Sequence, residues 1–72
     1  MNQTIFHGVE ITDHAGRLDF IITPDRAAAL TLARQLYQKE EARANRWTCF
    51  FATYTKCGTF SRLDGYELIP QS

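Results

Sequence analysis

The sequence predicts a single α+β domain over residues 1–72, with one amphipathic helix between two β regions. Alternating apolar and polar residues surround a short turn in the first third of the chain. A run of good helix formers follows, and then a segment rich in aromatic and β-branched residues. The expected order is β-β-α-β-β, a small antiparallel sheet with the helix packed on one face. The pattern leaves open whether residues 66–69 add a fifth strand.

The first β region has the pattern of a hairpin. Residues 4–12 and 17–23 alternate in polarity, and Asp13-His14-Ala15-Gly16 between them carries turn chemistry. We expect one face of this hairpin to enter the core and Phe6 and Ile21 to oppose it. The expected core set is Ile5, Val9, Leu18, Phe20 and Ile22.

The predicted helix runs from Pro24 to Asn45. Thr23 is a suitable N-cap, Pro24 fits the first helical position, and Asp25 opposes the positive end of the helix dipole. At the helical period, one apolar arc collects Ala29, Leu30, Leu32, Ala33, Leu36 and Tyr37. Because this arc ends at Tyr37, the basic segment 39–46 is expected to project beyond the sheet.

The second β region opens with a strand over Trp47–Thr55. A turn is expected at 56–58, and a further strand over 59–63. Asp64-Gly65 is a strong two-residue hairpin signal, which would start a short last strand before Pro70.

Composition narrows the classes of function. Eight basic and eight acidic residues give a net charge of zero, which argues against a DNA-mimicking acidic protein and against a strongly basic nucleic-acid binder. No stretch is apolar for long enough to span a bilayer, and the N-terminal residues do not resemble a signal peptide. Cys49 and Cys57 are too few for a disulfide framework. These features favour a cytoplasmic protein without contact with a membrane.

No pattern in the chain predicts catalysis or a cofactor. His7, His14, Cys49 and Cys57 carry zinc-ligand side chains, but not at the short intervals of zinc motifs. Nothing near either cysteine would lower its thiol pKa, and adjacent glutamates on a helix point about 100° apart. We therefore predict no catalytic residue, no metal and no cofactor, and a protein that is not an enzyme.

The number of apolar faces points to an interaction module. One helix covers one face of a four-stranded sheet, yet both faces of the Trp47–Thr55 strand are large and apolar. An uncovered apolar face normally marks a surface for a partner or for self-association. Aromatic and arginine side chains are the usual anchors of such surfaces. The predicted partner-binding residues are Trp47, Phe50 and Tyr54, with Arg43, Arg46 and Arg62 on the rim.

Three alternatives use the same residues. Sheet aromatics beside basic side chains can stack the bases of single-stranded nucleic acid, although the zero net charge makes this less favoured. The uncovered face could instead form a homodimer. In the third alternative, the C-terminal segment Tyr66–Ser72 covers that face and leaves no binding surface.

In this plan the chain resembles the small accessory proteins of phages and mobile elements, and among them it is similar to anti-CRISPR proteins. The similarity is one of architecture: a short domain, one helix on a small antiparallel sheet, near-neutral charge and no catalytic motif. No motif matches residue for residue, so no functional residue carries over. The resemblance implies an inhibitor that binds a host defence complex of the CRISPR-Cas kind, in the cytoplasm of a bacterial host cell.

Overall fold

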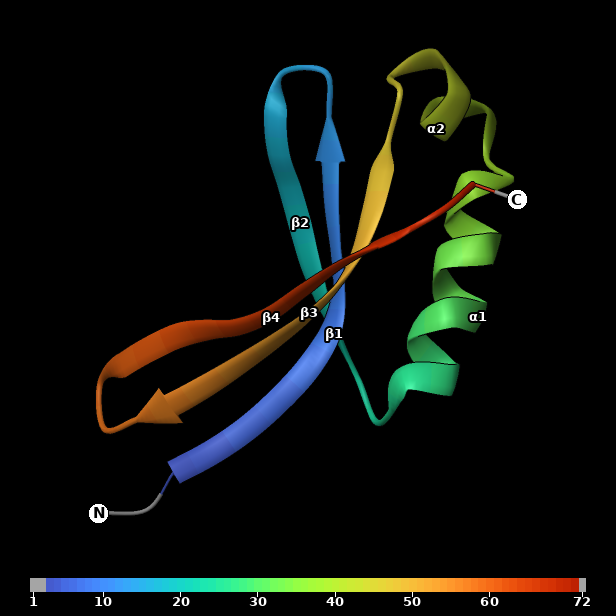
Figure 1. Cartoon of the computed structure of the whole chain (residues 1–72). Helices are drawn as coiled ribbons and strands as arrows, with labels where there is room; N and C mark the ends of the chain where they lie inside the picture. The colour runs from blue at the N-terminus through green and yellow to red at the C-terminus, as the bar shows by residue number, and fades with distance from the viewer. Residues whose placement is uncertain (1–2, 72) are drawn as a thin grey trace.

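The computed structural model describes residues 3–71, apart from the side chains of Arg17 and Leu18. It confirms the α+β class and the antiparallel sheet. Four strands pair in the order β2-β1-β3-β4, so the hairpin at each end of the chain supplies one half of the sheet (Figure 1). The elements are β1 Gln3–Asp13, β2 Gly16–Thr23, α1 Arg26–Tyr37, α2 Glu40–Ala44, β3 Thr48–Cys57 and β4 Phe60–Ile69.

The turn of the first hairpin sets the pairing at the tip of β1 and β2, and an irregularity next to it then shifts the register. The Asp13 carboxylate accepts hydrogen bonds from the backbone N–H groups of Ala15, at 2.8 Å, and Gly16, at 3.0 Å. Asp13 therefore pairs with Gly16, but the register shifts by one residue between Thr12 and Ile11, so that further along the hairpin Val9 pairs with Ile21. Val9 and Ile21 share the face that packs under the helix.

The predicted core set of this hairpin is therefore partly wrong. Val9 is fully buried, but Ile22 is 66% exposed and Ile5 is 65% exposed. Phe20 pairs with Glu10, on the face turned away from the helix. The cause is that β2 is apolar on both faces, so alternation alone could not say which one enters the core. Leu18 lies outside the described side chains.

The predicted single helix is two helices. Asp25, and not Thr23, caps α1, because its carboxylate accepts the backbone N–H of Ala28 at 2.8 Å. The chain leaves the helical conformation at Lys39, where ψ is 142°. It then turns back into α2, so that Ala42 is fully buried in the core. The segment 39–46 thus folds against the sheet and does not project beyond it.

The second hairpin turns at Gly58, whose φ is 62°. β4 then runs without interruption to Ile69, so the hairpin expected at Asp64-Gly65 is wrong, and residues 66–69, left open by the sequence, do not form a separate strand. Asp64 instead forms a bulge, because Gly65 pairs with Thr53 while Leu63 pairs with Tyr54.

Side-chain hydrogen bonds hold that bulge. The Asp64 carboxylate accepts the hydroxyl of Thr55 and, at 2.8 Å, the Nε–H of Arg62. Both hydrogen bonds lower the pKa of Asp64, and the bond from Thr55 has the larger effect. Because its carboxylate bonds to Thr55 and Arg62 of the same sheet, Asp64 lies in a bulge of β4 and does not begin a turn.

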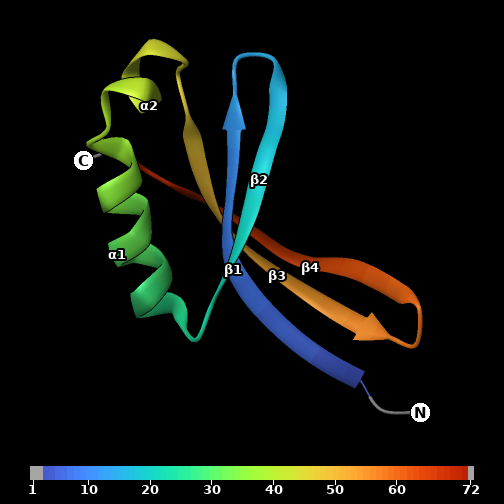
Figure 2. The same cartoon turned by 180° about the vertical axis from the view of Figure 1, so that it is seen from behind.

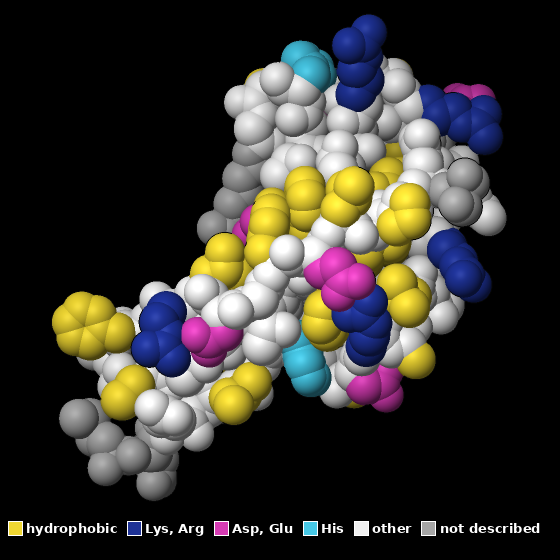
Figure 3. Space-filling view, viewed as in Figure 1, with side chains coloured by type: hydrophobic (Ala, Val, Ile, Leu, Met, Phe, Trp, Pro, Cys, Tyr) yellow, Lys and Arg dark blue, Asp and Glu magenta, His cyan; other side chains and the backbone are white. Residues whose placement is uncertain are grey.

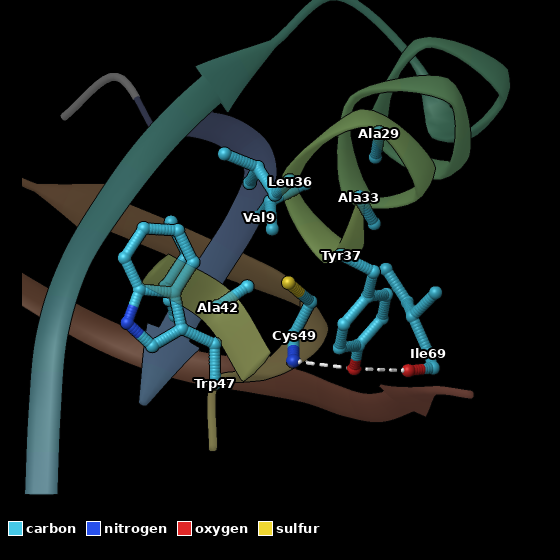
Figure 4. Close-up of a cluster of buried hydrophobic side chains, with 10 residues drawn as sticks. Val9, Ala29, Ala33, Leu36, Tyr37, Ala42, Trp47, Cys49 and Ile69 are labelled. Atoms are coloured by element: carbon cyan, nitrogen blue, oxygen red, sulfur yellow. Dashed lines mark hydrogen bonds between the residues drawn. The ribbon is translucent and has the colours of Figure 1, made fainter. Parts of the chain in front are cut away.

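The Tyr37 hydroxyl joins the helix to the end of the sheet (Figure 4). It donates to the carbonyl oxygen of Ile69 at 2.6 Å and accepts the backbone N–H of Cys49 at 2.7 Å. Cys49 and Ile69 are paired residues of β3 and β4, so the Tyr37 side chain supplies a hydrogen-bond partner to one backbone group of each strand. Burial raises the pKa of Tyr37 and that of the Cys49 thiol, which keeps both groups protonated.

The core is confined to one half of one sheet face. Val9, Ile11, Cys49 and Ile69 of the sheet meet buried residues of the helices and Trp47. The other ends of β1, β3 and β4 extend away from α1 as a three-stranded arm, residues 3–5, 55–57 and 60–63 (Figures 1 and 2). The molecule measures 44 × 26 × 15 Å.

This shape exposes more surface than a compact monomer would. The accessible area is 5078 Å², against about 4,600 Å² expected for a folded monomer of this mass. The radius of gyration is 12.9 Å, where about 11 Å is expected for this length. The excess comes from the sheet that no helix covers.

We predict that Gly8→Ala prevents folding. A Cβ at Gly8 would lie 2.0 Å from the carbonyl oxygen of Ile21, so β1 and β2 would have to separate. The expected cost is about 3 kcal/mol or more, which approaches the roughly 3–5 kcal/mol that a domain of this size holds. In urea denaturation followed by circular dichroism, the control Gly65→Ala, whose nearest atoms would lie at 3.6 Å, should stay folded. A stable Gly8→Ala variant would contradict this packing.

We predict that Tyr37→Phe destabilises the fold by about 2–4 kcal/mol, because two buried backbone groups lose their partner. The change keeps the aromatic ring, so the loss of stability measures the contribution of the hydroxyl group. Hydrogen exchange gives the sharper readout. The Cys49 amide should exchange much faster in the variant, while the Val9 amide should change only as far as global stability does. Equal acceleration at both amides would argue against the bridge.

Candidate functional site

The face of the sheet away from α1 is the candidate site, and we call it the outer face. Strand pairing assigns its members, because residues directly opposite each other on paired strands share a face. Tyr54 pairs with Phe6 and Leu63, Phe50 pairs with Leu68, and Ala52 pairs with Tyr66. Its apolar residues are Phe6, Phe20, Ile22, Phe50, Ala52, Tyr54, Leu63, Tyr66 and Leu68.

Three aromatic rings in the middle of the outer face pack against one another. Tyr54 stacks on Phe6 with ring centroids 5.7 Å apart, and Phe20 meets Tyr54 edge-on at 5.1 Å. Each is half-buried although no element lies above them. Such offset and edge-on pairs contribute about 0.5–1.5 kcal/mol each beyond the area they bury. The rings therefore form a fixed platform.

A second stack and a border of exposed side chains extend the platform to both edge strands. Phe50 stacks on Tyr66 at 4.3 Å. On β2, Ile22 is 66% exposed, and on β4, Leu68 is 57% and Tyr66 is 46% exposed. The outer face is thus firmly packed at its centre and presents apolar side chains to solvent at its edges.

One carboxylate lies within this apolar face. Glu10 of β1 is only 7% exposed. Its Oε1 accepts the hydroxyl of Tyr54 at 2.9 Å. The hydrogen bond fixes the orientation of the Tyr54 ring, since a buried acidic side chain has to keep its hydrogen bonds.

The structure brings together only two of the six predicted partner-binding residues. Phe50 and Tyr54 lie on the outer face, on the same side of β3. Trp47 does not, because it is 9% exposed and packs in the core with Ala42. Its backbone N–H donates to the Ala42 carbonyl at 2.9 Å, which draws Trp47 beneath α2.

The three predicted rim arginines do not surround the outer face. Arg43 and Arg46 lie close together at α2, where the backbone N–H of Arg46 donates to the carbonyl of Arg43 at 3.4 Å, and Arg62 lies on the arm. Arg43 is on α2 and lines a groove beside α1. Arg46 follows α2 in the left-handed region, with φ of 55°, and lines a small hollow with His14. Arg62 pairs with Thr55 on the helix side of the arm and binds Asp64. The rim of basic residues predicted around the aromatics is therefore not formed.

Sequence reasoning misses the edge residues Ile22, Tyr66 and Leu68. Ile22 belongs to the predicted core set because the register set by the turn after Asp13 would pair it with His7, on the face of Val9. The register shift between Thr12 and Ile11 instead pairs Ile22 with Gly8, on the outer face. Tyr66 and Leu68 belong to the outer face because β4 is continuous through the bulge at Asp64. No sequence signal separates such a bulge from the hairpin that Asp-Gly usually indicates.

The residues considered for metal or thiol chemistry do not assemble. Cys49 is fully buried, and burial raises the pKa of its thiol, which disfavours the reactive thiolate. Among residues 3–71, no three His, Cys, Asp or Glu side chains are grouped as a metal site.

In the same described part, no helix is long and apolar enough to cross a membrane.

No protein-family model, curated protein or solved structure matches this chain. A functional role therefore has to be inferred from the geometry of its surfaces, the outer face first among them.

We predict that Ile22→Ser and Leu68→Ser, alone or together, leave stability within about 1 kcal/mol of the parent chain, because both side chains are mostly in solvent. Val9→Ala is the matched core control, and its fully buried side chain should cost about 2 kcal/mol. The measurement is the free energy of unfolding of each variant, obtained by urea titration. A loss at Ile22 or Leu68 as large as that at Val9 would place the outer face in the folding core.

Proposed function

We propose that this protein is a non-enzymatic protein-binding module that works through the outer face. One observation carries the proposal: the outer face has a packed aromatic centre, yet Ile22, Leu68 and Tyr66 remain about half or more exposed. Contiguous exposed apolar surface with aromatic side chains is typical of protein interfaces.

The physical form of the face suits binding. Its aromatic rings are held by one another and by the hydrogen bond from Tyr54 to Glu10, so little side-chain entropy is lost when a partner packs on them. The exposed residues lie on β2 and β4, the two edge strands, which frame that centre. Anchors near the middle and smaller apolar contacts around them are the usual distribution of binding energy.

For the partner, we propose a protein of a host defence complex, with this chain acting as its inhibitor. The support is the architectural resemblance to anti-CRISPR proteins. A short domain without site chemistry can inhibit only by occupying a surface, and the outer face is the apolar surface available for that. The resemblance supplies no residues, so the binding residues are taken from the structure.

The arrangement of charge disfavours single-stranded nucleic acid as the ligand of this face. Base stacking by sheet aromatics needs cations along the same groove to hold the phosphates. Arg43, Arg46 and Arg62 lie elsewhere, and Lys56 is on the outer face only at the end of the arm, where it pairs with Thr4. Glu10 places a carboxylate among the rings.

The test is a comparison of variants as bait. We expect Ile22→Asp with Leu68→Asp to abolish capture of the partner from lysate of the native host, because burying two carboxylates in an apolar interface is costly. Gln35→Asp, on the exposed side of α1, is the matched control and should capture as the parent does. Proteins lost only with the outer-face variant are identified by mass spectrometry and then bound in purified form.

Three results would overturn the proposal. One is a partner that the outer-face variant still binds with the parent's affinity. The second is a homodimer: if sedimentation of the purified parent shows a dimer that Leu68→Asp dissociates, the face serves self-association. The third is binding of a labelled single-stranded oligonucleotide that is lost in the same variant, which would point to nucleic acid instead.

A further inference from the structure

A second surface, on the helix side of the molecule, is hollowed. An open groove of about 730 Å³ runs between the C-terminal half of α1 and the end of β4, with α2 at one end. Leu30, Tyr37 and Ile69 form its apolar floor, and Pro70 forms the wall that follows β4. Its volume lies within the range of about 300–1,000 Å³ that ligand sites occupy.

Among the residues that the structure describes, the charged side chains that line the groove are all positive and none is negative. They are Arg34 of α1 and Arg43 of α2, and both are exposed. Within residues 3–71 neither arginine forms an ion pair, whereas Arg26 and Arg62 are each paired with a carboxylate. Figure 3 shows hydrophobic side chains between the sheet and α1, with Lys or Arg side chains at the right-hand edge.

The floor of the groove is held rigidly. Tyr37 is fixed by its two hydrogen bonds to Cys49 and Ile69, and Ile69 is 4% exposed. Pro70 ends the strand and offers no backbone N–H. A ligand therefore meets a preformed apolar strip. Beside the strip lie two guanidinium groups, one from Arg34 on α1 and one from Arg43 on α2.

We propose that this groove binds an acidic segment of a partner protein, with carboxylates on Arg34 and Arg43 and an apolar side chain on the floor. Guanidinium groups pair with carboxylates through two parallel hydrogen bonds. A small inorganic anion would leave the apolar floor uncovered. A nucleic acid would find aliphatic Leu30, Ile69 and Pro70, and beside them a Tyr37 ring that is only 7% exposed, where base stacking needs exposed aromatic faces.

This groove site does not depend on the outer face. The two surfaces lie on opposite sides of the sheet, and they share no residue. A partner with both an apolar surface and an acidic segment would engage both surfaces, but either contact can fail alone. Variants of one surface therefore serve as controls for the other.

The experiment uses a displayed library of random short peptides, selected on the whole protein. The double variant Arg34→Gln with Arg43→Gln provides the counter-selection, and because both side chains are exposed it should keep the thermal stability of the parent. We expect enriched peptides to combine Asp or Glu with apolar residues. One such peptide, made synthetically, should bind the double variant at least about tenfold more weakly, a change of about 1.4 kcal/mol. Arg62→Gln, on the arm, should bind it like the parent.

The site is read out by NMR. The acidic peptide should shift the backbone amides of Gln38 and Gln71, which also line the groove, and leave those of Phe6 and Ile22, on the outer face, unchanged. The proposal is overturned if no peptide is enriched, if the enriched peptides lack acidic residues, or if the double variant binds as tightly as the parent. It is also overturned if a single-stranded oligonucleotide binds the groove more tightly than the peptide.

Discussion

The Tyr37 hydroxyl sets the arrangement of this small domain. It bonds to the N–H of Cys49 and the carbonyl of Ile69, so the last turn of α1 is fixed at one end of the β3–β4 pair. At the other end of α1, the Arg26 guanidinium binds the Glu67 carboxylate of β4 at 2.5 and 2.7 Å and lies 5.0 Å from the Phe51 ring centroid. This exposed pair adds orientation more than stability, whereas the buried hydroxyl leaves two backbone groups unsatisfied if it is lost.

A helix of about three turns fixed in this position can cover only part of one sheet face. The outer face and the three-stranded arm stay in solvent, and the accessible area exceeds that of a compact monomer. The outer face nevertheless keeps its shape, because its rings pack on one another and Tyr54 bonds to Glu10. The same placement of the helix opens the groove beside Leu30 and Tyr37, on the other side of the sheet. Both proposed contacts thus follow from the position of α1.

The sequence could predict the fold class, the order of the elements and the surplus of apolar surface, because periodicity and turn residues report these locally. It could not predict which face of β2 is buried, since both are apolar and the choice depends on pairing with Val9. Nor could it predict the bulge at Asp64, which rests on hydrogen bonds from Thr55 and Arg62. The break before α2 is tertiary as well, because it serves to bury Ala42 and Trp47. The predicted site kept Phe50 and Tyr54 and lost Trp47 for these reasons.

In the free protein, the helix buries one half of one sheet face and leaves the outer face open. Hydroxyl-radical footprinting of the dilute, purified chain tests this arrangement directly, with oxidation located by mass spectrometry. We expect strong labelling of Leu68 and Tyr66 on β4 and of Ile22 on β2, with protection of Tyr37 and Trp47 beneath the helices. Protection of Leu68 and Tyr66 in the dilute monomer, or labelling of Trp47 equal to theirs, would contradict it.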